Sequence, residues 1–368
     1  VNPNMITRYR KYEIIVLRAK RKGKQRQGDL INYKNTQFTK RARADLEKIN
    51  EFIAGHNINL DITDEQEEAL RDRMQNRDDP ARDNYLDFTK THLRRIFNNG
   101  SFEQGGRFYG GWWQQIPGDY RHFITINGKR TVGLDYSGMH FAIMYADLGM
   151  STPMEDSYAL ESYSSELRSD IKKAFHIIIN CSTRKKAIET INSCIRNEEL
   201  SADLVDGESL LEAFEETHPL IKDKIASGEG IKGQFTDSQI AERILLKGID
   251  IDLCILPIHD GFITTAGDEL VLERLMNEAF KEVTGHDSRI KPETFDVAMT
   301  ADAGNDAPYW ITRSDGAVDR DGPIEGKATS FSQVHTKESL WERIEEDAYR
   351  KTRKNRRDEE WEQAHGQK

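Results

Sequence analysis

The chain has 368 residues, of which 32% are charged and 37% apolar, and its formal net charge is −10. This length allows two domains, or one domain with subdomains, around a substantial core. The sequence has no apolar run of the ~18 to 20 residues that cross a bilayer, and no signal peptide. We therefore expect a soluble, intracellular and cytoplasmic protein without a membrane partner, with its three scattered cysteines as buried thiols: Cys181, Cys194 and Cys254.

The charges are unevenly distributed along the chain. Residues 1–44 contain thirteen Lys or Arg and only two acids, so the remainder is strongly acidic. We interpret residues 1–44 as a basic N-terminal arm that either contacts phosphates or stays solvated. Residues 306–368 carry few aromatic or branched side chains and many charges of both signs, which is typical of a charged C-terminal tail.

Residues 45–104 are predicted to form a mostly helical, thumb-like region. Two apolar faces at helical spacing support this: Leu46, Ile49, Phe52 and Ile53, and then Tyr85, Phe88, Leu93 and Ile96. A glycine-rich aromatic loop follows at Gly105–Pro117. Its Tyr109, Trp112 and Trp113 are candidates for stacking on bases, while burial in the core is the alternative that we favour for one of the tryptophans.

Two predicted hairpins each place an aspartate at the end of a strand. The first runs over Tyr120–Ile126 and Thr131–Asp135 with an Asn-Gly turn. The second turns at His259-Asp260-Gly261, and Pro257 in its first strand indicates a sheet edge or a bulge. A carboxylate at a strand end is fixed in space yet open to solvent, as a site for divalent cations and phosphate requires. An N-cap at Asp135 and an ordinary turn at Asp260 are the alternatives.

Helices are predicted between and after these hairpins, at about 138–147, 164–197, 209–226, 237–247 and 270–283. Within the second of them, Arg168, Lys172 and His176 recur every four residues and so lie along one flank of the helix. A row of donors suits a polyanion such as a nucleoside triphosphate. A solvated basic face is the alternative.

In this order the elements resemble the palm and fingers of the family A DNA polymerases and the related single-subunit phage RNA polymerases. Asp135-Tyr136-Ser137 is similar to their motif A, Arg168 and Lys172 to motif B, and His259-Asp260 to motif C. Gln114-Gln115-Ile116-Pro117 and Thr236–Ala241 also resemble family segments, and the likeness spans about residues 105–297.

The resemblance implies an α+β fold, with an antiparallel palm sheet over residues 105–305 and a reduced helical fingers insertion at about 149–234. It implies that Asp135 and Asp260 hold two Mg²⁺ (or Mn²⁺) ions and that His259 supports the primer end or the second carboxylate. The implied nucleotide contacts are Arg168, Lys172, His176, Asn180, Tyr136, Ser137 and His140. The implied contacts with primer, template or a single strand are Arg107, Trp112, Trp113, Gln114, Gln115 and Gln239.

Departures from the family pattern leave several properties open. His140 stands where DNA polymerases place a sugar-gating Glu, Asn180 where relatives carry a Tyr, and Gly261 where DNA polymerases carry a Glu. DNA or RNA as the product, and the need for a template, therefore stay undecided. The alternatives to a polymerase are an RNase H-like two-metal nuclease, with Asp237 or Glu242 as a further acid, and a catalytically inactive polymerase-like nucleic-acid-binding protein.

Overall fold

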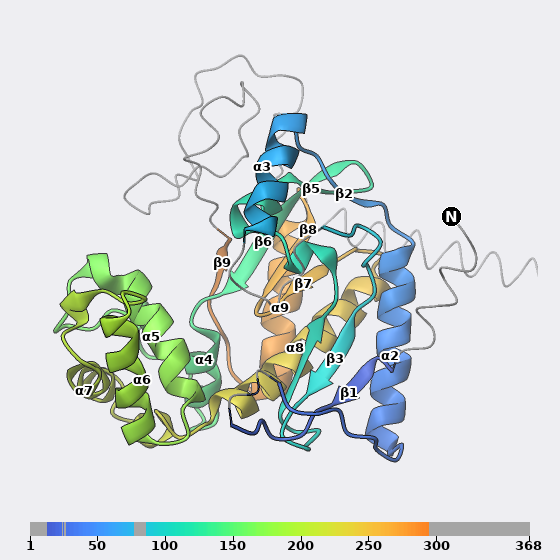
Figure 1. Ribbon diagram of the computed structural model, residues 1–368. Helices are drawn as coiled ribbons and strands as arrows, with labels where there is room; N and C mark the ends of the chain where they lie inside the picture. The colour runs from blue at the N-terminus through green and yellow to red at the C-terminus, as the bar shows by residue number, and fades with distance from the viewer. Residues whose placement is uncertain (1–12, 24, 26, 77–85, 294–368) are drawn as a thin grey trace, which may run out of the picture. The chain divides into compact units, whose positions relative to one another are not determined.

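The computed structural model describes residues 13–23, 25, 27–76 and 86–293 (Figure 1). The strands are β1 Ile15–Leu17, β2 Ile58–Leu60, β3 Arg94–Phe97, β4 Gly105–Tyr109, β5 Ile124–Ile126, β6 Lys129–Tyr136, β7 Leu256–Ile258, β8 Gly261–Thr265 and β9 Ile290–Pro292. The α-helices are α2 Gln37–Ala54, α3 Asp64–Gln75, α4 Met139–Ala146, α5 Arg168–Asn180, α6 Arg184–Arg196, α7 Gly207–Thr217, α8 Gly230–Asp250 and α9 Glu269–Thr284. The predicted tail at 306–368 lies outside the described residues.

Two sheets organise the strands. The larger has the order β2-β5-β6-β8-β7, with β9 paired to β6, and every one of its pairings is antiparallel. The smaller has the order β1-β3-β4, in which β1 runs parallel to β3. The predicted α+β class with an antiparallel sheet is therefore confirmed. As the sequence indicated, Pro257 lies on an edge strand, β7.

Turn chemistry and alternation shape the larger sheet. The β5–β6 turn has positive φ at Asn127 (53°) and Gly128 (75°), the requirement of the tight turn that Asn-Gly favours. In β6, Val132 and Leu134 are buried apolar residues. The predicted strand before this hairpin is shorter than expected, because Gly118–Phe123 forms a 3-10 helix.

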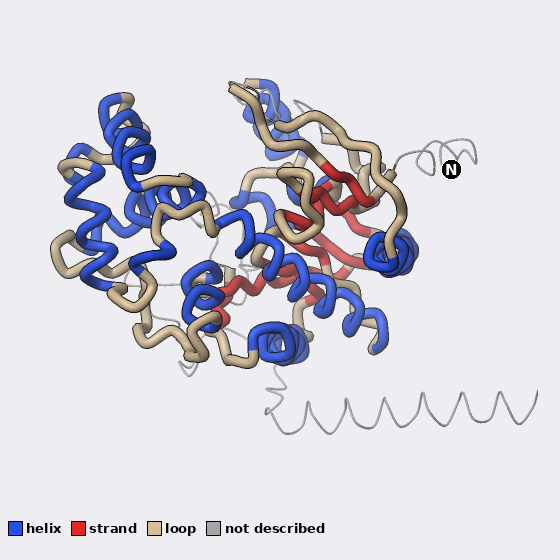
Figure 2. Tube along the Cα trace, turned by 90° about the horizontal axis from the view of Figure 1, so that it is seen from below, coloured by secondary structure: helices blue, strands red, loops and turns tan. Residues whose placement is uncertain are grey.

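The helices α5, α6 and α7 form a group apart from the strands, on the left of Figure 1 and again in Figure 2. Together with α4 they enclose an apolar cluster that includes Phe141, Tyr145, Ile171, Phe175, Ile178, Leu210 and Phe214. The ring of Phe141 stacks on that of Phe175 with centroids 4.0 Å apart. Helix α8 returns the chain from this group to the sheets and packs against β4 and α9 (Figure 1).

The N-terminal third differs from the helical prediction. Of the two amphipathic helices proposed for residues 45–98, the first is part of α2, whereas the described residues of the second, from 86 onward, form no helix. Ile96 instead lies in β3 and the buried Leu93 directly before it, where strand pairing overrides helical spacing. Part of the basic arm also forms a strand, because β1 pairs with β3.

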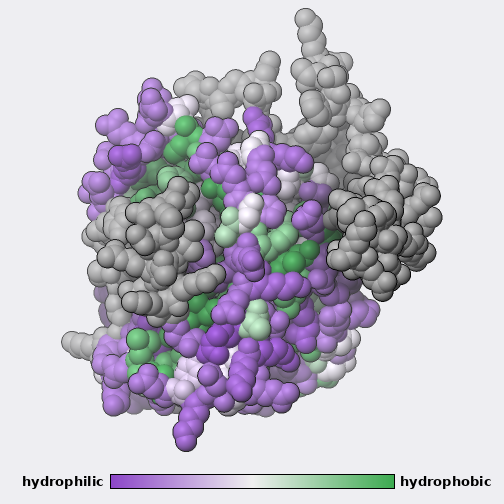
Figure 3. Space-filling view, turned by 90° about the vertical axis from the view of Figure 1, so that its right-hand side faces the viewer, coloured by the Kyte–Doolittle hydropathy of each residue, from purple (hydrophilic) through white to green (hydrophobic). Residues whose placement is uncertain are grey.

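Surface and core follow ordinary rules. The face seen in Figure 3 is mostly hydrophilic, with apolar residues in small patches. Cys181 and Cys254 are buried, as expected, while Cys194 is half-buried. None of the described helices is both long enough and apolar enough to span a bilayer.

Candidate active site

The two predicted aspartates come together, Asp135 on β6 and Asp260 in the turn before the neighbouring strand β8. In the pairing of β6 with β8, Asp135 lies opposite Gly261, the residue that follows Asp260. The backbone N–H of Tyr136 donates to the carbonyl oxygen of Asp260, at 3.4 Å. A side chain at position 261 would place its Cβ 3.5 Å from Oδ1 of Asp135. Glycine at this position therefore keeps the space beside the carboxylate open.

The two carboxylates repel one another. Burial, and next the charge of Asp260, raise the pKa of Asp135 to about 7, against the opposite effect of Lys291 and Lys172. Neither carboxylate has a hydrogen bond or ion pair with another described residue. The pair thus concentrates negative charge that a cation would stabilise.

The turn that carries Asp260 is strained. His259 has a φ of 57°, a left-handed conformation that is unfavourable for any residue with a Cβ. Its ring is exposed and meets that of Tyr109, from β4, edge-on with centroids 5.8 Å apart. A two-residue connection between β7 and β8 requires such a φ. The conformation of this two-residue turn therefore determines the position of Asp260.

The predicted row on α5 faces this carboxylate end of the sheet. Lys172 lies within electrostatic range of Asp135, and its side chain makes no hydrogen bond or ion pair with a described residue. Arg168, one turn earlier, forms an ion pair with Asp156 and lies over the ring of Tyr158, at 5.5 Å. The helix thus presents one unpaired and one paired cation.

Two histidines lie where α4, α5 and α8 meet. His140 is only 7% exposed, and no hydrogen-bond partner in the described part of the chain reaches its Nδ1. Burial, and next the charge of Arg107, lower the pKa of His140 to about 4, so its ring is neutral at physiological pH. His176 is exposed, and its ring lies edge-on to that of His140 at 6.0 Å.

Two buried ion pairs attach the smaller sheet to α8. Arg95 is fully buried and donates to Glu242, to the Ser238 hydroxyl and to the Gly106 carbonyl. Arg107 pairs with Asp237, whose side chain is 2% exposed. Arg107 is thus committed to the interior, which corrects its predicted contact with nucleic acid.

The aromatic loop is structural. Trp112 and Trp113 are both 0% exposed, so the expectation that either stacks on bases is wrong. Trp113 Nε1 and Gln114 Nε2 donate to the Pro257 carbonyl, at 3.2 and 2.9 Å, and Gln114 Oε1 accepts from the Gly110 N–H. The predicted nucleic-acid contact of Gln114 is wrong because both ends of its half-buried amide are engaged in these hydrogen bonds. The loop holds the strand that leads to His259.

The predicted contact of Tyr136 with the nucleotide is also wrong. Because side chains alternate along a strand, it points to the face of β6 opposite to Asp135. It is 2% exposed, and its hydroxyl donates to the Met276 carbonyl at 2.6 Å, so it does not contact a nucleotide. Ser137 lies at the end of the same strand, where its backbone N–H donates to the Arg289 carbonyl at 2.8 Å.

Three further residues were predicted to contact the nucleotide or the nucleic acid: Asn180, Gln115 and Gln239. Asn180 is exposed at the end of α5 and donates to the His176 carbonyl at 2.7 Å. Gln115 and Gln239 are half-buried, and Gln239 Nε2 has no hydrogen-bond partner among the described residues. Their roles stay predictions.

Lys291 is a site residue that the sequence did not reveal. It lies on β9, directly opposite Asp135 in the β6–β9 pairing. Burial, opposed by Asp135 and reinforced by Lys172 and Arg168, lowers its pKa. The short segment around it has no sequence signal of its own, since long-range strand pairing alone brings it to Asp135.

The donor set suits magnesium. The described residues contain no group of three or more His, Cys, Asp or Glu side chains arranged to hold a metal. Mg²⁺, however, is usually bound by one or two carboxylates, with water and substrate phosphates as its other ligands. Asp135 and Asp260, mutually repelling and without partners of their own, fit such a site.

Comparisons with known proteins give a weak likeness to solved structures. No family model and no curated protein matches the chain. It is similar to the POL domain of Pol1 from M. smegmatis, solved in complex with a DNA primer-template and dNTP, with a TM-score of 0.36 and 13% identity. The match covers 55% of this chain and 47% of that one, so the chain spans about half the length of this neighbour.

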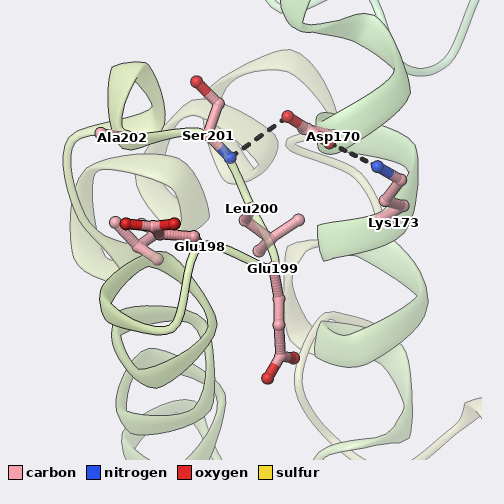
Figure 4. Close-up of a pocket in the computed structure, with 8 residues that line it drawn as sticks. Asp170, Lys173, Glu198, Glu199, Leu200, Ser201 and Ala202 are labelled. Atoms are coloured by element: carbon pink, nitrogen blue, oxygen red, sulfur yellow. Dashed lines mark hydrogen bonds and ion pairs between the residues drawn. The ribbon is translucent and has the colours of Figure 1, made fainter. Parts of the chain in front are cut away.

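Two surface hollows lie near the helical group. One of about 360 Å³ is lined by Asp170, Glu198, Glu199 and Ser201, and Asp170 accepts hydrogen bonds there from Lys173 and from the Ser201 backbone (Figure 4). Neither catalytic candidate lines it. A second, of about 180 Å³, includes Ser137, Ser157 and Arg289 and so begins where β6 ends.

Proposed function

We propose that the protein is a metal-dependent nucleotidyltransferase, polymerase-like, that adds nucleotides to the 3′ end of a nucleic acid. The observation that carries this proposal is the placement of Asp135 on β6 beside Asp260, in the turn that leads into the paired strand β8, close to the cationic flank of α5. Two carboxylates beside unpaired ammonium groups match the needs of in-line attack on a nucleoside triphosphate, where metal ions and cations both stabilise developing charge.

Each group has a role in this proposal. Asp135 and Asp260 would hold Mg²⁺ or Mn²⁺, and the chemistry that two such ions supply is activation of the 3′-hydroxyl and stabilisation of the leaving pyrophosphate. Lys172 contacts the triphosphate. Arg168, held by Asp156 and Tyr158, supports the same end of the substrate from a fixed position.

The nucleic-acid end approaches from the other side of the hairpin. His259 is exposed beside Asp260, and Tyr109 supports its ring. On the smaller sheet Arg94 lies opposite Tyr109 and is exposed, without a hydrogen bond or ion pair to a described residue. Together, His259, Tyr109 and Arg94 offer stacking and phosphate contacts to a nucleic-acid end that reaches the two carboxylates.

The nuclease alternative is less well supported. It needs acids beyond Asp135 and Asp260, for which Asp237 and Glu242 were the candidates. Each is instead the buried partner of an arginine, Asp237 with Arg107 and Glu242 with Arg95. A carboxylate neutralised in this way is a poor ligand for a second site.

The decisive test uses labelled primer-template and labelled single strands with Mg²⁺ or Mn²⁺ and, separately, deoxyribonucleotides and ribonucleotides. Extension is expected, and Asp260→Asn should abolish it. Glu273→Gln on α9, an acid outside the site, is the matched control and should extend normally. Shortening of the strand would support the nuclease instead, and a mobility shift without either reaction would support the inactive binding protein.

A further inference from the structure

The strand β9 adds a cation to the carboxylate site from the sheet itself. It pairs with the edge of β6 that β8 leaves free near Asp135, and its central residue, Lys291, stands opposite Asp135. Directly opposed residues of an antiparallel pair project to the same face. Lys291 and Asp135 therefore share the face on which the substrate would lie.

Lys291 is half-buried and has no carboxylate of its own. Its side chain makes no hydrogen bond or ion pair with any residue in the described part of the chain. The charge of Asp135 attracts Lys291, but the two side chains form no ion pair within 4.0 Å. Asp135 also interacts electrostatically with Lys172. A partly desolvated ammonium group held in this way is stabilised when a further anion arrives.

Two cations from different elements meet here. Lys291 comes from a strand and Lys172 from α5, and the charge of Lys172 contributes to the lowered pKa of Lys291. The strand lies on the side of β6 that faces α4 and α5 in Figure 1. Since the two ammonium groups repel, a ligand with several negative charges bridges them better than a single carboxylate does.

We propose that Lys291 is a substrate-contact residue that binds the phosphate tail of the incoming nucleoside triphosphate, together with Lys172. This inference rests on the proposed function. In the reaction the 3′-oxygen of the nucleic acid forms a bond to the α-phosphorus, and the bond from that phosphorus to the bridging oxygen breaks. The electron pair leaves on pyrophosphate, and the hydroxyl proton passes to solvent. Lys291 stabilises the charge that collects on the leaving pyrophosphate.

The experiment compares Lys291→Met, which keeps most of the side-chain stem, with Lys291→Arg, which keeps the charge. Calorimetry measures the binding of inorganic pyrophosphate with and without Mg²⁺, and steady-state extension separates KM for the nucleotide from kcat. We expect Lys291→Met to weaken pyrophosphate binding and to raise KM, each about tenfold or more, and Lys291→Arg to restore most of both. Lys129→Ala, at the exposed start of β6, is the matched control and should change neither.

Two results would overturn the inference. If Lys291→Met leaves pyrophosphate affinity and KM unchanged, Lys291 does not contact phosphate. If it lowers only the thermal midpoint, and Asp135→Asn restores that midpoint in the double variant, Lys291 merely compensates the charge of Asp135. Failure of the proposed function looks different: the wild-type protein would then extend no primer, while the pyrophosphate titration would still report on Lys291.

Discussion

The interior around α8 and the carboxylate end of the larger sheet treat charge in opposite ways. At α8, each buried arginine has its own acid, Arg95 with Glu242 and Arg107 with Asp237. At the end of β6, Asp135 and Lys291 share one face of the sheet with Lys172 of α5 in electrostatic range, and none of the three forms an ion pair with a described residue. Paired charges fix the position of a helix, whereas unpaired and partly desolvated charges are stabilised when a ligand of opposite charge binds.

The largest effect should come from breaking the paired region. Arg95→Met would leave Glu242 buried without its partner, and we expect a loss of about 3–5 kcal/mol in the free energy of unfolding. Chemical denaturation measures it. The double variant Arg95→Met with Glu242→Leu should recover most of the loss, because it leaves no unpaired charge; a double variant as unstable as the single one would contradict this account.

The unpaired region should respond in the opposite direction. Because the pKa of Asp135 is raised to about 7, the folded state keeps a proton that the unfolded state loses above about pH 4, so this group lowers stability as pH rises from about 4 to 7. Asp135→Asn should therefore stabilise the protein at pH 8, on the order of 2 kcal/mol, while extension falls roughly a thousandfold.

Thermal unfolding at pH 8 and pH 4 checks this prediction. The gain should be present at pH 8 and nearly absent at pH 4, where Asp135 of the folded wild-type protein is protonated and as uncharged as the asparagine. Asp119→Asn, an acid that pairs with Arg73 on the surface, is the control and should bring no such gain. If Asp135→Asn instead lowers the stability at pH 8, the ionised Asp135 stabilises the fold and does not destabilise it.

The sequence predicted the local parts of this arrangement. Asn127-Gly128 fixes a turn, the spacing of Arg168 and Lys172 fixes a helical flank, and the acids follow apolar strands; each depends on residues within a few positions of one another. Alternation along β6 also places Tyr136 on the opposite face, a signal that was present but overlooked in favour of the motif. For Trp112 and Trp113 the sequence favoured burial of one and left stacking open for the other, whereas both are buried, because a loop of aromatics and glycines has the same composition whether it is exposed or buried.

Lys291 lay beyond prediction for a different reason. More than a hundred and fifty residues separate it from Asp135, and only the register of β9 on β6 joins them. The pairing of Arg107 with Asp237 likewise joins residues 130 positions apart. Contacts of this kind depend on how the whole fold packs, and local sequence patterns do not predict that packing.

A smaller effect should come from the strained turn. Since His259 has a positive φ, His259→Gly should relieve backbone strain and stabilise the protein by about 0.5–1 kcal/mol, despite the entropy that glycine adds to the unfolded chain. Extension should fall, because the contact with Tyr109 is lost. His259→Ala removes the same ring but keeps the strain, so it should lose activity without the gain measured by denaturation. Equal stability of the two variants would show that the turn is unstrained.

A comparably small effect should come from His218, whose two ring nitrogens both have partners, unlike Nδ1 of His140, which no described residue reaches. It is 0% exposed and joins the Tyr145 hydroxyl (3.1 Å) to the Ser157 carbonyl (2.9 Å). Burial lowers its pKa, so the unfolded state binds a proton first as pH falls, and stability decreases from about pH 6.5 downward. We expect about 1 kcal/mol between pH 7 and pH 5, absent in His218→Gln. Hydrogen exchange should place this loss in α5–α7, opposite in sign to the effect of Asp135; an acid-induced loss that the variant retains would assign it to other groups.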